Sequence, residues 1–322
     1  MDGLLIVDKP AGWTSHDVVA RARRLLGEKR VGHTGTLDPF ATGVLVLLVG
    51  RATRLAQFLV GAEKEYEATI RLGHSTTTGD LTGERRAGAE AGEVMRAGAT
   101  DCAALERDQF EAALATLRGE IEQVPPMYSA KKVGGRKLYE LARRGEEVER
   151  RAARVTVSAF EVLGEESDAW SRPNDDGTCD VRVRVVCSAG TYVRALAESV
   201  GERLGTGAHL AALRRTRAGQ FRVEDALTPD GLQKLFEAGA DAGEFLLPPE
   251  AALPHLPSAH LTSDEARRAR HGAAICVGEE ARAWDDGGHV LLLEGGGRLL
   301  AVGVYDAARR VLQPRVMLAG EK

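Results

Sequence analysis

The sequence predicts an α+β protein made of one large domain and one small, mainly β domain. The chain has 322 residues, which is more than one small hydrophobic core accommodates. Helical and strand-like patterns are mixed without the regular spacing of βαβ units. Four prolines between residues 248 and 257 indicate a linker, and the glycine-rich segment after them has the pattern of short strands. We therefore expect a large domain at residues 1–250 and a small one at residues 251–322.

The first part of the chain contains several recognisable elements. Residues 4–7 form a short apolar run that predicts a buried strand. Thr14 and Asp17 have the spacing of a capping box, apolar residues then recur at helical spacing, and Gly27 supplies the stop. The elements that follow are a polar, glycine-rich loop at 32–43, an apolar strand at 44–49, a short helix at 53–59 and an alternating strand at 64–72.

The rest of the chain combines weakly and strongly patterned segments. An Ala- and Gly-rich stretch at 87–105 predicts a variable loop. Residues 123–151, with paired prolines and paired glycines, predict a protruding loop and helix rather than core. The elements with clear periodicity are helices at 108–117, 192–204 and 263–270 and strands at 155–163 and 181–188. There is no internal repeat.

Composition and motifs narrow the classes of function. The first apolar stretch ends at Asp8 and Lys9, which makes it too short for a secretory signal, and no run approaches the roughly 18 residues of a membrane span. None of the four cysteines lies in a CxxC or in a Cys/His cluster with zinc spacing. Neither a GxxxxGK[ST] phosphate loop nor a GxGxxG after a strand is present. The sequence therefore predicts a cytoplasmic protein with free thiols and gives no support for a nucleotide cofactor.

The net charge of the chain is negative, but the positive charges are concentrated in two segments. The net charge is −4, which by itself argues mildly against nucleic-acid binding. Residues 131–154, however, contain nine cations and four acids, and residues 203–222 contain five arginines and no acid. RNA phosphates need local positive potential rather than a basic average. Because charged runs are usually solvated surfaces, these two patches alone are weak evidence for RNA binding.

The loop at residues 32–43 is the best candidate for a site, because polar side chains between rigid elements are where catalysis tends to occur. Its one carboxylate, Asp38, suits nucleophilic or acid–base work at a sugar or a base. Asp-Pro also commonly initiates a turn, so the spacing leaves both interpretations open. His33, beside glycines, is either a structural histidine or a substrate contact, and the spacing does not separate these either.

Two further side chains have both a structural and a functional interpretation. Tyr66 lies on the alternating strand, where core packing is the default, although an aromatic ring also stacks on a nucleobase. Arg194 lies at a strand-to-helix junction, where it is either exposed or buried against an anion such as a catalytic aspartate. We expect an ion pair between Arg194 and Asp38 that keeps the carboxylate ionised and lowers its pKa.

Five segments of the chain carry a family resemblance. They are LLIVDKPAGWTSHDVV, VGHTGTLDPFATGVLVLLVG, KEYEATIRLG, QVPPMYSAKKVGGRKLYELARRGE and VRVRVVCSAGTYVRALAESVGERLGTGAHLAALRRTRAGQF. In this order they resemble the bacterial TruB family of tRNA pseudouridine synthases over nearly all of residues 4–225, and GHTGTLDPFATG is highly specific. The C-terminal region, with GAAICV and LLAVGVYDAARRVLQPRVML, is similar to a PUA RNA-binding domain, with a weaker signal.

The resemblance implies a fold and a function. The fold would be that of pseudouridine synthases, with a central mixed, mainly antiparallel sheet and flanking helices, followed by a PUA-like domain. The enzyme, an isomerase, would convert uridine 55 in the TΨC loop of tRNA to pseudouridine after flipping the base out of the loop. The tRNA T-arm stem-loop is the expected partner. No cofactor, metal, membrane or protein partner is implied, and a monomer is expected.

The resemblance also implies roles for individual residues. Asp38 of the TLDP segment would be the essential aspartate, and an insertion at about residues 124–152 would grip the T-arm. Tyr66 would stack on the base and is a candidate to take the C5 proton. The expected lining of the uridine pocket is His33, Tyr66, Tyr192, Arg194 and Leu213, with Lys9 and Pro10 beneath it as support. The expected RNA-binding cations are Lys131, Lys132, Arg136, Lys137, Arg143, Arg144, Arg214 and Arg215.

Two other functions are compatible with parts of the sequence. An RNA-binding or tRNA-folding factor without catalysis would have the same basic patches, although a pure binder has no need of Asp38. A glycosidase-like enzyme acting on free nucleosides predicts a closed pocket without basic flanks and usually a second carboxylate, and neither is apparent. The isomerase is therefore the leading interpretation.

Overall fold

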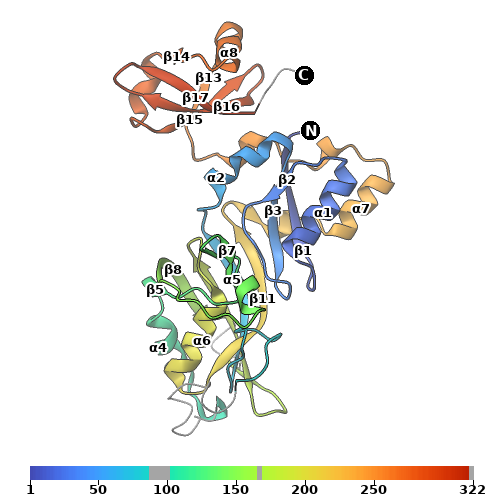
Figure 1. Cartoon of the computed structure of the whole chain (residues 1–322), viewed down its shortest axis with the longest axis vertical. Coiled ribbons are helices and arrows are strands. Elements are labelled where there is room, and N and C mark those ends of the chain that lie inside the picture. Colours follow the sequence, from blue (N-terminus) through green and yellow to red (C-terminus); the bar gives the residue numbers. More distant parts are fainter. Residues whose placement is uncertain (87–101, 165–168, 319–322) are drawn as a thin grey trace.

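The computed structural model describes residues 1–86, 102–164 and 169–318 (Figure 1). Its main sheet has ten strands, with the path β1-β3-β11-β4-β10-β8-β5 and with β2, β9 and β12 paired to members of that path. The strands are β1 (Gly3–Lys9), β2 (Val31–His33), β3 (Thr42–Val49), β4 (Lys64–Leu72), β5 (Gly119–Gln123), β8 (Ala153–Val162), β9 (Arg172–Pro173), β10 (Cys179–Cys187), β11 (Ala208–Ala218) and β12 (Phe221–Arg222). Among these described strands only β3 and β11 pair in parallel, so the sheet is mixed and mainly antiparallel, as predicted.

One half of the main sheet is buried on both faces. Along β1, successive side chains point to opposite sides, so that Leu4 packs into one hydrophobic cluster and Leu5 into another. Helices α1 (Ser15–Leu26) and α7 (Pro229–Glu237) lie together over the second side (Figure 1). Burial of both faces explains the uninterrupted apolar run of β3, since neither set of side chains meets water.

The other half of the sheet buries one face and leaves the other in solvent. The inward side chains of β4 and β10 pack under α6 (Val193–Leu204) and α4 (Arg107–Ala115). The outward side chains are charged and pair across strands, as Arg184 does with Glu65 at 2.8 Å. This arrangement accounts for the alternation of polar and apolar residues that predicted both strands.

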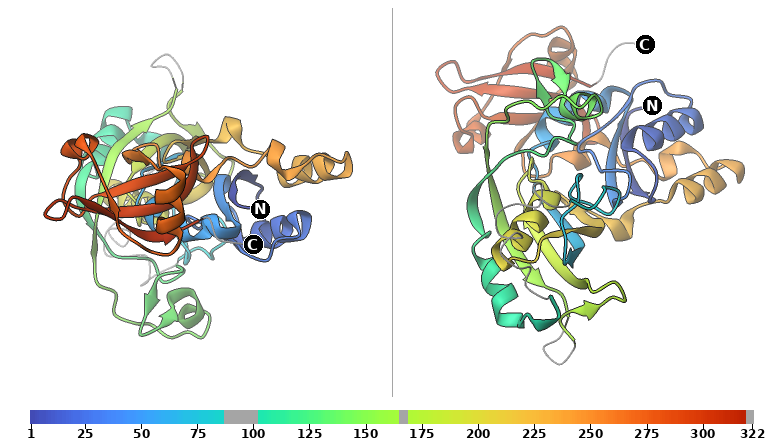
Figure 2. Two further views of the ribbon diagram at one scale, coloured as in Figure 1. Left: turned by 90° about the horizontal axis from the view of Figure 1, so that it is seen from above. Right: turned by 60° about the horizontal axis from the view of Figure 1, so that its bottom comes forward.

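The segment between β5 and β8 projects from the sheet. We call residues 124–152 the insertion, because Gln123 and Ala153 at its two ends pair across β5 and β8. Its elements are β6 (Lys132–Val133), β7 (Arg136–Lys137) and α5 (Leu138–Ala142). Figure 2 shows this hairpin and helix, in green, standing apart from the main sheet. The structure thus has the protruding loop and helix that the sequence predicts.

A second sheet forms the C-terminal part of the chain, in the order β13-β15-β16-β17-β14. Its strands are β13 (Ser258–His260), β14 (Ile275–Cys276), β15 (His289–Glu294), β16 (Arg298–Asp306) and β17 (Val311–Met317). The predicted short helix is present as α8 (Ser263–Arg270) and packs into the core of this sheet. Arg54 Nη1 donates to the carbonyl of Met317 at 2.7 Å and so ties the sheet to the first half of the molecule. The β-rich C-terminal unit is therefore confirmed.

Most predicted elements are present, with ends shifted by a few residues. The predicted helix at 53–59 is a 3₁₀ turn, η1 (Gly50–Leu55), that continues into α2 (Ala56–Leu59). The predicted loop at 87–105 lies largely outside the described residues. Further 3₁₀ turns are η3 (Cys102–Ala104), η4 (Val223–Asp225), η5 (Ala242–Glu244), η6 (Pro249–Ala252) and η7 (Glu279–Ala283). No helix in the described ranges is long and apolar enough to cross a membrane.

Candidate active site

A pocket of about 250 Å³ opens near the place where β3 and β11 meet in the sheet. Its walls come from the loop before β3, from β4 and β11, from the insertion and from the segment that enters α6. Five of the residues that the sequence predicts at the uridine are in this lining: Asp38, Tyr66, Tyr192, Arg194 and Leu213. Arg215, predicted as an RNA-binding cation, also lines the pocket. The fold therefore brings together side chains that are far apart along the chain.

Two buried side chains hold the backbone on either side of Asp38. Ser15 Oγ accepts a hydrogen bond from Leu37 N at 2.9 Å and donates one to Leu37 O at 3.2 Å. Lys9, which is fully buried, donates from Nζ to the carbonyl of Pro39 at 3.2 Å. Burial lowers the pKa of Lys9 to about 8, and the negative charge of Asp38 opposes that shift. Lys9 thus supports the loop from beneath and is not itself part of the pocket lining.

The start of the same loop is fixed by Arg215 of β11. Its side chain donates from Nε to the carbonyl of Val44 at 2.7 Å and from Nη2 to that of Gly35 at 3.1 Å. Gly43 allows β3 to come this close, since its φ is +101° and a Cβ there would lie 2.2 Å from the Arg215 carbonyl oxygen. The parallel contact between β3 and β11 therefore requires glycine, and this contact lies where the loop ends and β3 begins.

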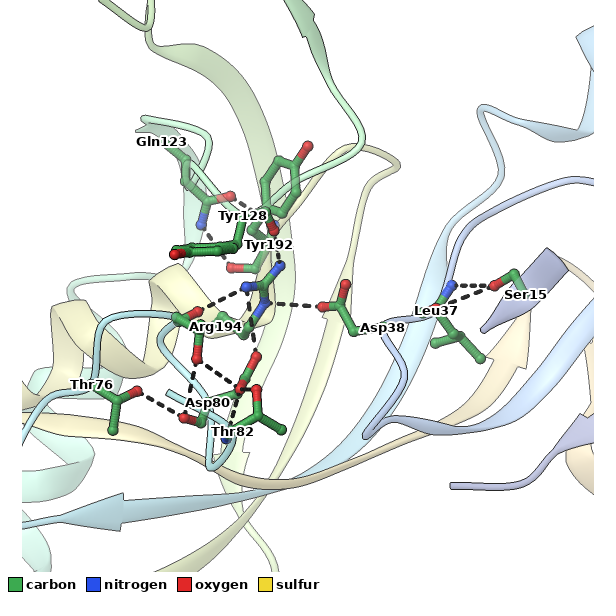
Figure 3. Close-up of polar contacts among 11 residues, drawn as sticks. Ser15, Leu37, Asp38, Thr76, Asp80, Thr82, Gln123, Tyr128, Tyr192 and Arg194 are labelled. Carbon is green, nitrogen blue, oxygen red and sulfur yellow. Dashed lines mark hydrogen bonds and ion pairs between the residues drawn. The ribbon is translucent and has the colours of Figure 1, made fainter. Parts of the chain in front are cut away.

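Arg194, in the first turn of α6, is buried and bonded on several sides (Figure 3). Its Nε lies 2.9 Å from Asp38 Oδ2, and its Nη1 lies 3.6 Å from Asp80 Oδ2. Nη1 also donates to the carbonyl of Thr78 at 2.8 Å, and Nη2 donates to that of Tyr128 at 2.7 Å. The predicted ion pair is confirmed. The Asp38 side chain remains 35% exposed, which leaves it accessible from the pocket that it lines.

Asp80 belongs to this network although the sequence patterns do not single it out. It is buried, and its Oδ1 accepts from Thr82 N at 2.9 Å and from Thr78 Oγ1 at 2.8 Å. The Thr76 hydroxyl donates to the Asp80 carbonyl at 2.8 Å. Asp80 is therefore fixed by its own loop before it meets Arg194. In the sequence, Asp80 could have been recognised as a carboxylate flanked by threonines, whose hydroxyls suit it as hydrogen-bond donors.

The electrostatics of the ion pair correct one expectation. Burial raises the pKa of Asp38; Arg194 opposes the rise, whereas the negative charge of Asp80 adds to it. The net direction is upward, so the predicted lowering of this pKa is wrong, because desolvation of the carboxylate outweighs the attraction of the arginine. An ionised Asp38 is consequently a stronger base than an exposed aspartate, and it takes up a proton at a higher pH.

Tyr66 provides the aromatic surface of the pocket. It lies on β4 opposite Arg215 of β11 and is 8% exposed. Burial raises the pKa of its hydroxyl, and the positive charge of Arg215 opposes the rise. The phenol therefore stays protonated at neutral pH. A neutral aromatic ring in a pocket wall suits the stacking of a nucleobase.

Comparison with known proteins identifies the family. The model described as TruB family pseudouridylate synthase (N terminal domain) matches residues 23–193, and the tRNA pseudouridylate synthase B C-terminal domain matches residues 194–254. The chain belongs to the TruB family of pseudouridylate synthases. It is 47% identical over 323 residues to the tRNA pseudouridine synthase B of Thermobifida fusca, with 99% of each chain covered.

A second TruB relative and a solved structure support the same family and fold. The chain is 46% identical over 275 residues to tRNA pseudouridine synthase B of Geobacillus kaustophilus, covering 85% of this chain and 91% of the relative. It also resembles a chain from a structure of an H/ACA RNP bound to a substrate RNA containing 2′-deoxyuridine, with a TM-score of 0.68 and 26% identity. That match covers 98% of this chain and 85% of the other. The predicted pseudouridine synthase fold is thereby confirmed.

Two of the residues expected from the TruB resemblance lie elsewhere than predicted. His33, at the end of β2, is not among the residues that line the pocket; its ring packs edge-on against His16, with centroids 5.8 Å apart, and burial lowers its pKa. Arg215, expected to bind RNA phosphates, is 2% exposed and uses its guanidinium to hold the loop before β3. Its neighbour Arg214 faces outward and pairs with Asp8 at 2.8 Å.

The cations of the insertion lie on an accessible surface of this TruB-family chain. Of the six that the sequence predicts to bind RNA, Lys137 is half-buried, and the exposed ones are Lys131, Lys132, Arg136, Arg143 and Arg144. Within the part of the chain that the structure describes, none of these six forms an ion pair. The outer face of the sheet differs, since Arg217 there pairs with Glu63 at 2.8 Å. Unpaired cations on a projecting element keep their charge available for phosphate groups.

Proposed function

We propose that this chain isomerises uridine 55 in the TΨC loop of tRNA to pseudouridine, without a metal or a cofactor. The observation that carries the proposal is the 2.9 Å ion pair between Asp38 and Arg194 in the wall of a pocket of about 250 Å³. A pocket of this size suits a single nucleoside, and a uridine in a folded loop reaches Asp38 only when its base is flipped out. Relatives named tRNA pseudouridine synthase B support tRNA as the substrate.

The reaction breaks the bond between N1 of uracil and C1′ of the ribose and forms a bond between C5 and C1′. Asp38 starts it in the ionised form by one of two routes. In the first, the carboxylate attacks C1′ and uracil leaves with the bonding electrons. In the second, Asp38 removes a proton from C2′, which gives a glycal and free uracil, and the proton returns to C2′ when C5 joins C1′. In both, the turned base loses the proton on C5 to water and gains a proton from water on N1, so the composition of the RNA is unchanged.

The side chains around Asp38 are proposed to position the carboxylate and to hold the base while it turns. Arg194 holds the carboxylate at the sugar and limits the rise of its pKa. Tyr66 stacks on the uracil while the base is detached and turned. Because burial raises the pKa of Tyr66, its neutral phenol is a weak proton acceptor, and we assign it stacking rather than removal of the C5 proton. Leu213 and Tyr192 complete the wall against which the base turns.

Docking of the RNA is proposed to involve both the insertion and the C-terminal unit. Six cations of the insertion, Lys131, Lys132, Arg136, Lys137, Arg143 and Arg144, are suited to the phosphates of the T-arm, because they have no ion-pair partner in the described ranges. The PUA-like C-terminal unit is proposed to bind a further part of the RNA.

We propose a division into domains at residues 1–250 and 251–322, and a monomer that acts in the cytoplasm, where tRNA is available.

The test is turnover on a T-arm stem-loop transcript that carries C5-tritiated uridine, in the presence of EDTA. Formation of pseudouridine releases the tritium into water. Wild type is compared with Asp38→Asn and with a matched control, Asp175→Asn, which changes an exposed aspartate outside the pocket lining. We expect release by the wild type and the control, and loss of at least about a thousandfold in rate for Asp38→Asn with RNA binding retained.

Each other outcome is informative. Release that survives Asp38→Asn, or that EDTA abolishes, would contradict the proposed chemistry. Tight binding without release by the wild type would favour an RNA-binding factor. A transcript with cytidine in place of uridine 55 should release nothing. Deuterium at C2′ of uridine 55 then distinguishes the two routes, because only the glycal route slows when the C2′ bond is broken by Asp38.

A further inference from the structure

We propose that Gln123 is a positioning residue of this active site, which fixes the entry to α6 against the base of the insertion; the proposal rests on the proposed function. Gln123 is the last residue of β5 and pairs with Ala153 of β8, so it stands where the insertion begins. Its side chain is buried, at 7% exposure for the residue, and it is not among the residues that line the pocket. Any effect on the reaction must therefore pass through its neighbours.

The carboxamide of Gln123 bonds both backbone polar groups of Tyr192 (Figure 3). Oε1 accepts from Tyr192 N at 2.7 Å, and Nε2 donates to Tyr192 O at 3.1 Å. Tyr192 is the N-cap of α6, and its own side chain makes no capping bond. An amide N–H buried at such a position needs a partner. Gln123 supplies that partner from a strand that is already held in the sheet.

The same segment holds α6 at a second point. Tyr128, further along and within the insertion, accepts a hydrogen bond from Arg194 Nη2 at 2.7 Å. Gln123 and Tyr128 therefore fix Tyr192 and Arg194, both of which line the pocket. The position of Arg194 against Asp38 is consequently linked to the base of the element proposed to bind RNA.

Loss of the two Gln123 bonds leaves the part-buried Tyr192 N–H without its partner and loosens the first turn of α6. Arg194 then lies less well against Asp38. Because Arg194 opposes the rise in the pKa of Asp38, a weaker contact lets that pKa rise further. The defect should therefore appear in the chemical step and in its pH dependence, and not in the affinity for RNA.

The experiment is single-turnover tritium release at saturating stem-loop RNA between about pH 5 and 9. Gln123→Met keeps the length of the side chain and removes both bonds. Gln123→Glu keeps the acceptor for Tyr192 N at the helix N-terminus, where a carboxylate is favourable, and loses only the donor to Tyr192 O, so it restores one of the two bonds. Gln109→Met is the matched control, because Gln109 Oε1 also accepts from a backbone N–H, that of Glu106 at 3.0 Å, at the exposed cap of α4.

We expect Gln123→Met to lower the plateau rate at least about tenfold, to move the acid-side midpoint to higher pH, and to leave the Kd for RNA within about twofold. Gln123→Glu should recover part of the rate, because it keeps the bond from Tyr192 N, and Gln109→Met should match the wild type. The proposal is overturned if Gln123→Met keeps the wild-type rate and midpoint, if Gln123→Glu is no faster than Gln123→Met per folded molecule, or if the loss lies in Kd alone. An inactive wild type would instead refute the proposed function.

Discussion

Replacing Arg194 by methionine tests the charged network most directly. The substitution keeps an unbranched side chain and removes the 2.9 Å contact with Asp38 and the 3.6 Å contact with Asp80. Two carboxylates then remain without their shared cation. Removing one partner of a buried ion pair typically costs about 3–5 kcal/mol. We expect the free energy of unfolding at pH 7 to fall by about 3 kcal/mol, at the lower end of that range, because Asp38 is 35% exposed and partly solvated.

The same substitution slows the chemical step. A displacement of a reacting group by about 1 Å costs roughly a hundredfold in rate, which equals about 2.7 kcal/mol in the transition state. The pKa of Asp38 should also rise further, since burial and Asp80 are then opposed by Lys9 without the arginine. The acid limb of the pH–rate profile therefore moves to higher pH. Arg194→Lys keeps the charge but loses the planar fork, so its rate should lie between those of the wild type and the methionine variant.

The assay is single-turnover tritium release from about pH 5 to 9, with urea denaturation of the same samples. The matched control is Arg71→Met, which breaks the cross-strand ion pair with Asp180 at 2.7 Å, outside the pocket lining. The control should lower stability and leave the rate and the acid limb unchanged. An Arg194→Met variant with a rate within about threefold of the wild type and an unmoved acid limb would refute the role given to Arg194.

Three further perturbations test separate parts of the molecule. Gly43→Ala should lower the free energy of unfolding by more than about 2 kcal/mol, because the new methyl group would lie 2.2 Å from a carbonyl oxygen at a φ of +101°. The measurement is urea denaturation, with Gly12→Ala as the control. Gly12 also has a positive φ, but nothing lies within 4 Å of the new Cβ, so the comparison separates the clash from the backbone strain. Lys132→Ala should reduce the salt dependence of RNA binding by about one charge, measured by filter binding across a KCl series, with the rate at saturation unchanged. Burial lowers the pKa of His74 to about 4, below its value of 6.5 in the unfolded chain, so its neutral form favours folding above pH 6.5 and this contribution is lost as pH falls toward 4. Allowing for the partial exposure of the ring, we expect about 1–2 kcal/mol of this acid sensitivity to disappear in His74→Gln, and equal pH dependence of urea denaturation in both proteins would contradict it.

Features that act within a few residues could be predicted from the sequence. The capping box of Thr14 and Asp17 and the left-handed Gly27 delimit α1 as expected, because caps are made by neighbouring residues. Strand β4 has its predicted ends, since one buried face imposes strict alternation along it. The polar loop before β3 could be recognised as a site for a related reason: glycines and polar side chains between two apolar elements are unusual.

Strand β11 and helix α7 were not predicted from the sequence, for two different reasons. The alternation of β11 is broken by register shifts on either side of residues 212–215, and the buried Arg215 looks like a surface charge in the sequence. No local signal could have placed it near the middle of the sheet. Helix α7 did have a signal, since Thr228 caps it and Pro229 occupies its first turn, a common start of a helix. The acidic character of that stretch concealed it.

The network around Asp38 could be predicted only in part. A buried arginine needs an anion, and the TruB resemblance marks Asp38 as the aspartate of the site, so the two together predict the pairing of Arg194 with Asp38. The contacts that complete the network join Arg194 to Thr78 and Tyr128, which are distant in sequence, and spacing along the chain carries no information about such contacts. The direction of the Asp38 pKa was mispredicted for a related reason, because it is a balance between burial and several charges that only the folded chain assembles.

One arginine lies between two carboxylates in this site, and the second carboxylate adds to the basicity that burial gives to Asp38. Here burial and the charge of Asp80 raise the pKa of Asp38 against the pull of Arg194. Asp80→Asn should therefore move the acid limb to lower pH while it reduces the plateau rate, because Arg194 loses an anchor at 3.6 Å. This shift is opposite in sign to that of Arg194→Met, so two pH profiles separate the role of the charge of Asp80 from that of the arginine it holds.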